Sequence, residues 1–539
     1  MLDVRNLTIY IEDRKLIDNL SFSIDDGDKL AIIGEEGNGK STIAKAIACP
    51  SQISTYTHVS GQINIGNKTI GYLEQILNPK WYNQEIYKYF LKEEPDQDDD
   101  YENYERFGDI SRILNSFGLD SGILEGEQKI GELSGGEKVK LQLTKLMLKN
   151  PDILILDEPT NDLDIETLEW LEDFINKFKK PIIYISHDEE LLEKTANAIL
   201  HVEQLKKKTQ NKTTFARMKY REYVDRRLHD IQKQTQVALN ERAQDEIQME
   251  KWRQVYNRVD HELNTISRKD PHGARLLKKK MQSVKSQEKR FERERKEFTE
   301  IPDTEESIFL NFGEGYIPNG KTVCDINFDK IEVQGKTLAK NINLKVVGPE
   351  RIIIVGHNGV GKTTFIKKLN EQLMNREDIR TGYMPQNYED LLKNYDTVLD
   401  YVAENVYEKD DITKIRTYLA CLKFTKEEVM GNIKDLSGGQ KAKLFIAKLM
   451  MDECDVLILD EPTRNLSPLS NPVIRNALNS FDGAIISISH DRKFIKEIGS
   501  KVYELTQTGF IDISDKYLVN QDEGLRGKWN SNLKNPIIN

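Results

Sequence analysis

The sequence predicts an α/β protein in which two similar domains are joined by a long α-helical hairpin. Four short motifs occur in the same order in residues 1–203 and again in residues 305–515. Such self-similarity indicates a duplicated domain. Each half also alternates β-branched runs, such as residues 29–33 and 153–156, with amphipathic stretches. This alternation is typical of a parallel sheet with helices on its faces.

The composition narrows the class of protein. A chain of 539 residues is too long for a single hydrophobic core, so more than one domain is expected. Its composition, with 38% hydrophobic and 31% charged residues, is typical of a soluble globular protein. No apolar run approaches the ~18 residues of a membrane-spanning helix, and the N-terminus lacks the layout of a secretory signal. We therefore expect a cytoplasmic protein without a membrane partner. The four cysteines form no CxxC, so neither a disulfide framework nor a zinc site is indicated.

The first repeated motif is GEEGNGKS at residues 34–41, which returns as GHNGVGKT at residues 356–363. Each copy stands between a β-branched run and a helical stretch, the context expected of a phosphate-binding P-loop. Its glycines let backbone N–H groups turn toward an anion at the start of a helix, and Lys40 and Lys362 should meet the β- and γ-phosphates of ATP. The predicted nucleotide-binding residues of the loops are Gly34, Glu35, Glu36, Gly37, Asn38, Gly39, Lys40, Ser41, Thr42, Gly356, His357, Asn358, Gly359, Val360, Gly361, Lys362, Thr363 and Thr364.

The second motif, ILILDEPT and VLILDEPT, is a buried strand that ends in two adjacent carboxylates. The first carboxylate should hold Mg²⁺. The second, Glu158 or Glu461, should face the other way because side chains alternate along a strand, and it could polarise the attacking water. The predicted Mg²⁺ ligands are Ser41, Gln75, Asp157, Thr363, Gln386 and Asp460.

Two further motifs complete the repeat. His187 and His490 each end an apolar strand in SHD, and their repetition favours contact with the γ-phosphate, so they join Glu158 and Glu461 as predicted catalytic residues. LSGGE and LSGGQ place a serine and two glycines at a helix start, a second anion-binding arrangement. These signature residues are Ser134, Gly135, Gly136, Ser437, Gly438 and Gly439.

A P-loop followed by LSGGE or LSGGQ, LDEPT and SHD resembles the ATP-binding cassette (ABC) ATPases, and the resemblance covers both halves. It implies two cassettes that pair head to tail within a monomer, with each ATP between the P-loop of one and the signature of the other. One site would use Lys40 with Ser437, and the other Lys362 with Ser134.

The two halves differ at positions that the resemblance marks as functional. Tyr10 suits an aromatic residue that stacks on adenine, whereas the aligned position in the second half is Glu332. The first half has NDLD at residues 161–164, close to the family pattern, but the second has RNLSP, with Ser467 where an Asp is expected. We therefore expect unequal turnover at the two sites.

The segment between the cassettes, residues 204–304, is basic. Between Gln204 and Glu300 there are 26 Lys and Arg against 15 Asp and Glu, a net charge of +11 in a chain whose total is −11. This indicates either a solvated helical surface or a polyanionic partner. Pro271 and Gly273 should break the helix, with a second arm from Ala274 to Glu300. Helical spacing predicts facing apolar seams at Met249, Trp252, Tyr256, Val259, Leu263 and Ile266, and at Leu277, Met281, Val284, Phe291 and Phe298.

A tandem cassette with a basic helical linker and no membrane domain resembles the ABC-F subfamily. That resemblance implies docking at the tRNA exit site of the 70S ribosome, with the linker near 23S rRNA and the P-site tRNA. The short acidic region 78–111, where housekeeping members carry an arm, favours the type that protects ribosomes by displacing antibiotics; a general translation factor is the alternative. The predicted RNA-contacting tip residues are Arg268, Lys269, His272, Arg275, Lys278, Lys279 and Lys280.

Other classes of ATPase fit the sequence less well. A transporter ATPase has no use for the linker, repair and ribosome-recycling ATPases would show metal-binding cysteines, and a chromosome-structural ATPase would carry a far longer coiled coil. Residues 516–539 are expected to form a C-terminal tail.

Overall fold

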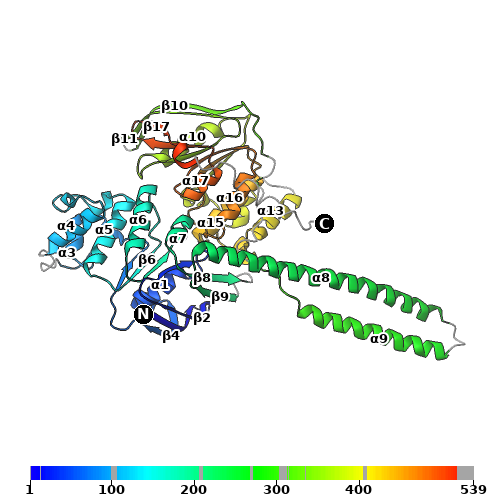
Figure 1. Ribbon diagram of the computed structural model, residues 1–539. Helices are drawn as coiled ribbons and strands as arrows, with labels where there is room; N and C mark the ends of the chain where they lie inside the picture. The colour runs from blue at the N-terminus through cyan, green and yellow to red at the C-terminus, as the bar shows by residue number, and fades with distance from the viewer. Residues whose placement is uncertain are drawn as a thin grey trace. The chain divides into compact units, whose positions relative to one another are not determined.

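The computed structural model describes residues 2–12, 14–98, 106–205, 210–266, 271–302, 312, 315–333, 335–404 and 409–518, with the main chain alone at 409–411. The chain divides into two compact units (Figure 1). The cassette unit comprises Met1–Tyr220 and Ile308–Asn539, and the hairpin unit comprises Arg221–Ser307. Within the cassette unit, the residues before the hairpin form the first cassette and those after it form the second.

Each cassette contains a six-stranded sheet, and the two sheets have equivalent strand orders, β5-β6-β7-β3-β8-β9 and β13-β14-β15-β12-β16-β17. Neighbouring strands are parallel except for the last pair of each sheet. The duplicated α/β domain predicted from the repeat is therefore confirmed. The strands are β3 (Lys29–Ile33), β5 (Ile70–Leu73), β6 (Ile153–Asp157), β7 (Ile182–Ile185), β8 (Ala198–Leu205), β9 (Gln210–Ala216), β12 (Arg351–Val355), β13 (Thr381–Met384), β14 (Val456–Asp460), β15 (Ala484–Ile488), β16 (Lys501–Thr506) and β17 (Gly509–Asp512).

Strand β9 lies within the stretch that the sequence analysis assigns to the linker. It pairs antiparallel with β8 along its whole length, from Leu205↔Gln210 to Ile199↔Ala216. The first sheet thus continues to Ala216, and the hairpin unit begins only at Arg221.

An antiparallel sheet accompanies the main sheet in each cassette. In the first cassette its order is β2-β1-β4, and in the second it is β10-β11. The strands are β1 (Leu2–Ile11), β2 (Arg14–Ile24), β4 (Thr57–Asn64), β10 (Thr322–Val333) and β11 (Lys336–Val347).

The helices follow the strands in the alternation expected of crossover connections. In the first cassette they are α1 (Lys40–Ala48), α2 (Pro50–Ile53), α3 (Ile86–Leu91), α4 (Phe107–Ser116), α5 (Gly135–Leu148), α6 (Ile165–Lys177), α7 (Glu189–Thr195) and the 3₁₀ helices η1 (Pro79–Trp81), η3 (Ser121–Leu124) and η4 (Ile130–Glu132). In the second they are α10 (Lys362–Met374), α11 (Glu389–Leu392), α12 (Val398–Val402), α13 (Lys409–Cys421), α14 (Lys426–Met430), α15 (Gly438–Met451), α16 (Asn471–Asn479), α17 (Arg492–Ile498), α18 (Ser514–Leu518) and η6 (Ile433–Asp435).

The central strands are buried over their whole length. Every residue of β3, β6, β7, β14 and β15 is buried, as expected for parallel strands covered on both faces. A separate apolar cluster in the first cassette contains Trp81, Tyr89 and Phe90. These residues belong to region 78–111, so its described part packs into a core of its own.

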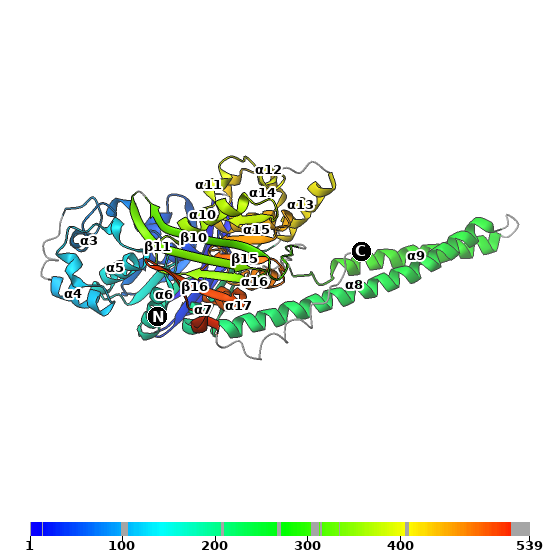
Figure 2. The same ribbon diagram turned by 90° about the horizontal axis from the view of Figure 1, so that it is seen from above.

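The hairpin unit consists of α8 (Tyr220–Thr265) and α9 (Pro271–Lys296), which lie side by side in both views (Figures 1 and 2). The predicted seams are confirmed: each seam residue is at least partly buried, with Val259 and Val284 fully so. The Trp252 indole Nε1 donates to the carbonyl oxygen of Val284 at 2.9 Å.

The predicted position of the helix break is only partly correct. Pro271 opens α9 rather than interrupting a helix, since the first turn needs no N–H donor from that residue, and Gly273 lies within this turn. The second arm therefore runs over Pro271–Lys296 instead of Ala274–Glu300.

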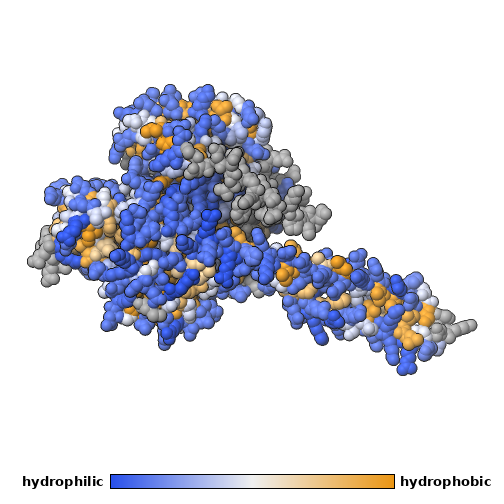
Figure 3. All heavy atoms as spheres, in the orientation of Figure 1, coloured by the Kyte–Doolittle hydropathy of each residue, from blue (hydrophilic) through white to orange (hydrophobic). Residues whose placement is uncertain are grey.

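Within the described ranges, no helix is both long enough and apolar enough to cross a membrane. Hydrophilic side chains cover most of the face shown in Figure 3, and apolar residues are scattered among them.

Candidate functional site

The first P-loop is shaped by close backbone contacts. Gly34 has φ 141°, and a Cβ there would overlap the carbonyl oxygen of Val202. That same oxygen accepts a hydrogen bond from Asn38 Nδ2 at 3.0 Å. Gly39, at φ 94°, is the N-cap of α1. The Lys40 ammonium donates to the Gly34 carbonyl at 2.8 Å, so the loop wraps around the lysine expected to meet phosphate.

The second P-loop has the same construction. Gly356 has φ 143°, and a Cβ there would overlap the carbonyl oxygen of Leu505. Gly361, at φ 104°, is the N-cap of α10. Lys362 Nζ donates to the Gly356 carbonyl at 2.6 Å and to that of His357 at 3.0 Å. The other predicted P-loop residues lie in these two loops and in the first turns of α1 and α10.

Asp157 ends β6 and faces the first P-loop. Its two carboxylate oxygens accept hydrogen bonds from Ser41 Oγ at 2.9 Å and from Tyr72 Oη at 3.0 Å. Burial raises the pKa of this carboxyl, and these hydrogen bonds only partly oppose the shift. Ser41 and Asp157 thus present adjacent oxygen atoms, the donors that Mg²⁺ prefers.

Asp460, the counterpart at the end of β14, provides a test of that fit. Neither of its buried carboxylate oxygens has a hydrogen-bond partner at normal geometry. Burial raises its pKa to about 6, and the nearby Thr363 hydroxyl and Lys362 charge only partly oppose this shift. Thr363 Oγ1 lies 3.5 Å from Gln386 Oε1. A buried carboxylate without partners is unfavourable unless a cation or a proton neutralises it. The residues of the second site therefore fit a divalent cation.

The two glutamates after these aspartates have an uncommon backbone. Glu158 has φ 49° and Glu461 has φ 54°, a left-handed conformation that costs a non-glycine residue about 1–2 kcal/mol. The expected alternation along the strand is therefore not what orients them: β6 and β14 end at the aspartates, and the backbone turns at the glutamate. Such strain is concentrated at functional sites.

Glu158 is surrounded by donors from its own cassette. Gln75 Nε2 donates to it at 2.7 Å and Asn161 Nδ2 at 2.8 Å, while His187 Nε2 lies 3.4 Å from its other oxygen. Burial alone would raise its pKa, but the interactions with His187 and Lys40 outweigh burial and lower the pKa to about 2. Glu158 is therefore ionised. Gln75, a predicted Mg²⁺ ligand, contacts Glu158 in this structure.

The surroundings of Glu461 in the second site differ from those of Glu158. Burial, with Asp460 beside it, raises the pKa of Glu461. His490 Nε2 lies 3.7 Å from Glu461, and both ring nitrogens of His490 lack a hydrogen-bond partner. Burial and the Lys362 charge lower the pKa of His490 to about 3, so His490 is neutral.

The signature serines cap the helices that follow them. Ser134 Oγ accepts from the N–H of Glu137 at the start of α5, and Ser437 Oγ accepts from that of Gln440 at the start of α15. Both helices therefore begin at the predicted position, with glycines in the first turn.

The first P-loop and the second signature contact each other across the cassettes. The Glu36 carboxylate accepts a hydrogen bond from the backbone N–H of Gly439 in the first turn of α15, and Glu35 forms an ion pair with Lys443 on the same helix. A carboxylate thus occupies the anion-binding start of α15. We refer to the surroundings of Lys40, Glu158 and this helix start as the first ATP site.

Across the second ATP site, around Lys362 and Glu461, the P-loop is joined to the loop that follows Glu158. His357 Nδ1 lies 3.1 Å from Asp164 Oδ2, and Asn358 Nδ2 donates to the Asp162 carbonyl at 2.5 Å. Asp164 also caps α6 by accepting from the Thr167 N–H at 3.0 Å. At the position equivalent to Asp164 stands Ser467, and α16 begins only at Asn471.

A cavity of about 180 Å³ lies between the cassettes at the first site. This is smaller than the roughly 300–1,000 Å³ of a typical ligand pocket. Its lining residues are Glu36, Gln75, Ile76, Glu158, Asn161, Asp162, His187, Arg464 and Asn465.

Several residues of the site were not predicted as such, among them Tyr72, Asn161 and Arg464. Tyr72 lies in the repeated GY of GYLEQ and GYMPQ, a signal that could have identified it. Asn161 and Arg464 stand at equivalent positions of the two halves. Because their side chains differ, nothing in the sequence indicated that both line the same cavity. The contact of His187 Nδ1 with the Leu466 carbonyl, at 2.7 Å, joins residues 279 positions apart, which no local pattern indicates.

The remaining predicted residues lie away from these contacts or on the other unit. Tyr10 is on β1, with the Lys15 ammonium 5.7 Å from its ring centroid, and Glu332 on β10 accepts from Lys330 at 2.7 Å. Arg268 and Lys269 lie outside the described residues. The exposed tip residues on α9 are His272, Arg275, Lys278, Lys279 and Lys280.

Comparison with known proteins agrees with this arrangement. The sequence model of the family described as ABC transporter matches residues 17–161 and 339–464, together half of the chain. The probable ATP-binding protein YbiT of Escherichia coli O157:H7 is 28% identical over an alignment that covers 96% of this chain and 98% of that protein. ABC transporter F family member 5 of Arabidopsis thaliana is 29% identical, covering 76% of this chain and 56% of that protein.

The fold also resembles a solved structure. An archaeal ribosome recycling factor, solved in complex with a ribosomal stalk protein, superposes with a TM-score of 0.54 at 16% identity and covers 92% of this chain and 88% of that one. At this level of identity the likeness is one of fold alone.

Proposed function

The chain belongs to the ABC transporter family of ATP-binding proteins, and from this premise we propose that it is an ATPase of the ABC-F type that binds the 70S ribosome through its basic hairpin. The observation that carries the ATPase assignment is the first site, where the P-loop of one cassette contacts the signature helix of the other and Glu158 lines a cavity between the cassettes. ATP bound at this position would join the cassettes, and its hydrolysis would separate them.

Hydrolysis at the first site is assigned to Glu158. An ionised carboxylate held by Gln75, Asn161 and His187 can orient the water that attacks the γ-phosphate. Mg²⁺, when bound, supplies positive charge beside the phosphates. Ser41 and Asp157 would hold it at the first site, and Thr363, Asp460 and Gln386 at the second.

The two sites are proposed to turn over at different rates. At the first site Glu158 accepts hydrogen bonds from Gln75 and Asn161. At the second site Arg464 stands in the place of Asn161, and its side chain pairs with Asp162 of the other cassette. The first site should therefore hydrolyse ATP faster while the second holds it longer.

The hairpin is the proposed RNA-binding element. Five exposed cationic or imidazole side chains of α9 lie within nine residues of its start, and such clusters bind phosphate backbones through counterion release. In this proposal the target is the 70S ribosome, as the ABC-F resemblance of the sequence implies, and the contacted nucleic acids are 23S rRNA and the P-site tRNA. In this proposal the hairpin displaces antibiotics from the peptidyl-transferase region. A general translation factor would use the same contacts on drug-free stalled ribosomes.

Ribosome binding is tested by trapping the ATP-bound form. The double variant Glu158→Gln, Glu461→Gln should bind ATP without hydrolysing it, and should co-sediment with ribosomes in ATP but not in ADP. Glu166→Gln with Glu371→Gln, two exposed positions, serves as the matched control and should sediment as the unmodified protein does. Equal sedimentation of the trapped variant with and without ATP would refute the proposal.

The role of the hairpin is tested separately. Replacing Lys278, Lys279 and Lys280 with alanine should reduce ribosome affinity and leave ATPase activity intact. The salt dependence of binding should also fall, by about one unit of slope for each RNA phosphate that the variant no longer neutralises. Lys177 and Lys179, replaced with alanine, control for the removal of positive charge elsewhere.

Drug susceptibility of a sensitive host then separates the two roles of the hairpin. Protection by the intact chain but not by the hairpin variant supports antibiotic displacement. No protection by either chain supports the translation factor.

A further inference from the structure

Arg464 of the second cassette occupies the position that Asn161 occupies in the first, 303 residues earlier. Asn161 hydrogen-bonds to Glu158 of its own cassette at 2.8 Å. Arg464 keeps the equivalent backbone turn, its N–H donating to the Glu461 carbonyl at 3.2 Å, but its guanidinium pairs with Asp162 of the first cassette at 2.8 Å. The side chain therefore crosses to the opposite cassette.

The side chain of Arg464 lines the cavity of the first ATP site. Arg464 and Asn465 line this cavity together with Glu158 and His187, whereas Glu461 and His490 do not. The Arg464 guanidinium thus lines the same cavity as Glu158, which is proposed to orient water at the first site. In the sequence, however, Arg464 follows Glu461 of the second site.

The side chains that line the cavity carry an excess of negative charge, which a cation would offset. Three of the lining side chains are carboxylates, Glu36, Glu158 and Asp162, and Arg464 is the lining residue with a permanent positive charge. A terminal phosphate would add further negative charge there. A guanidinium suits this task because its planar donors match phosphoryl oxygens in pairs.

The Arg464–Asp162 pair is also weak enough to exchange. The two side chains are 29% and 58% exposed, and ion pairs at such positions contribute only ~0–1 kcal/mol. A phosphate at the first site could therefore take the guanidinium from Asp162 at little cost.

We propose that Arg464 is a catalytic residue of the first ATP site, supplied in trans by the second cassette. Its guanidinium leaves Asp162 and binds the terminal phosphate of ATP, where it stabilises the charge that spreads over the phosphoryl oxygens as the bond from water forms and the bond to ADP breaks. A cation placed in this way raises phosphoryl-transfer rates on the order of 10³-fold or more in favourable cases. The inference rests on the proposed ATPase function.

The test uses single-site backgrounds. Glu461→Gln leaves the first site to hydrolyse ATP, and Glu158→Gln leaves the second. In the first background, Arg464→Asn, which installs the residue found at the equivalent position of the first cassette, should lower kcat at least ~10-fold with a much smaller change in KM. In the second background the same substitution should change the rate little. Arg464→Lys, which keeps the charge but loses the paired donors, should be intermediate.

Arg380→Asn removes an exposed arginine from the second cassette and should leave both backgrounds unchanged. Equal losses in the two backgrounds, or an undiminished rate at the first site, would overturn the role of Arg464 while leaving the ATPase function intact. An unmodified chain that does not hydrolyse ATP would overturn the proposed function, and this inference with it.

Discussion

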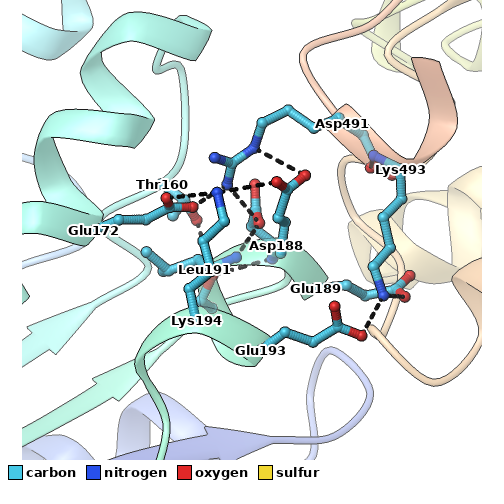
Figure 4. A network of polar contacts seen from close by, with 12 residues as sticks. Thr160, Glu172, Asp188, Glu189, Leu191, Glu193, Lys194, Asp491 and Lys493 are labelled. Atoms are coloured by element: carbon cyan, nitrogen blue, oxygen red, sulfur yellow. Dashed lines mark hydrogen bonds and ion pairs between the residues drawn. The ribbon is translucent and has the colours of Figure 1, made fainter. Parts of the chain in front are cut away.

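Arg475 of the second cassette and Glu189 of the first form a paired ionic contact inside the cassette interface. Nη1 lies 2.6 Å from Oε1 and Nη2 lies 3.2 Å from Oε2, and the two side chains are only 3% and 5% exposed. The Lys493 ammonium lies 3.2 Å from the carboxylate of Glu189 and 2.6 Å from that of Glu193 (Figure 4). Helix α7, which follows the SHD motif of the first cassette, begins with acidic residues, and α17, which follows that of the second, begins with basic residues. These helices therefore favour contact between a first and a second cassette over contact between two copies of the same cassette.

The first prediction concerns this pair. Glu189→Gln should lower the free energy of unfolding of the cassette unit by about 3–5 kcal/mol, because it leaves the Arg475 charge buried and incompletely compensated. Denaturant titration at neutral pH measures the change. Asp173→Asn, which breaks the exposed Lys177–Asp173 pair, should cost less than ~0.5 kcal/mol. A loss from Glu189→Gln as small as that of the control would show that Glu497, which lies 2.7 Å from Arg475, compensates for the missing negative charge.

The second prediction concerns Glu36, which the second P-loop replaces with Asn358. The Glu36 carboxylate holds the Gly439 N–H and repels an incoming phosphate. Glu36→Asn should therefore tighten ATP binding at the first site roughly tenfold, the equivalent of ~1.4 kcal/mol, a size expected for one hydrogen bond to a charged group.

Binding is measured with a fluorescent ATP analogue in a Lys362→Ala background, which weakens the second site. Glu371→Gln on α10 is the control for removal of a negative charge elsewhere. Unchanged or weaker affinity in the Glu36 variant would mean that this carboxylate supports the loop instead of competing with nucleotide.

The sequence was sufficient to predict what is encoded locally. The glycine loops, the helices capped by Ser134 and Ser437, and the seams of the hairpin follow from spacing and backbone preference within a few residues. Three features were not predicted: the β9 strand, the left-handed backbone of Glu158, and the crossing of Arg464 to Asp162. Strand β9 lies in a polar stretch without clear alternation and is held by its pairing with β8, and residue type does not specify a positive φ at a glutamate. The Arg464–Asp162 contact joins segments that meet only after both cassettes have folded.

A third prediction follows from Lys29 at the start of β3. Its ammonium donates to the carbonyls of Phe178 and, at 3.0 Å, Lys180, and burial lowers its pKa from 10.5 to about 8. A lysine with a lowered pKa contributes stability that is fully present above pH 10.5 and is lost as pH falls through about 8. Between these limits the contribution changes by at most about 3 kcal/mol.

The unfolding free energy of the unmodified protein, relative to that of Lys29→Met, should therefore rise from pH 8 to pH 10. Denaturant titrations at several pH values provide the comparison. Lys177→Met removes a lysine that is 78% exposed and should give a difference independent of pH. Parallel profiles for Lys29→Met and the unmodified protein would show that Lys29 stays protonated in the fold.

The last prediction addresses the hairpin seam. Trp252→Phe keeps an aromatic ring but removes the Nε1 donor to the Val284 carbonyl, a hydrogen bond of 2.9 Å. It should destabilise the pairing of α8 with α9 by about 1 kcal/mol, because the freed carbonyl lies at a buried residue. Amide hydrogen exchange should accelerate around Trp252 and Val284 roughly fivefold, with no change in the cassette unit. Val255→Ala, three residues along α8 and 41% exposed, should leave exchange unaltered. Acceleration spread evenly over both units would place the effect in global unfolding and not in the seam.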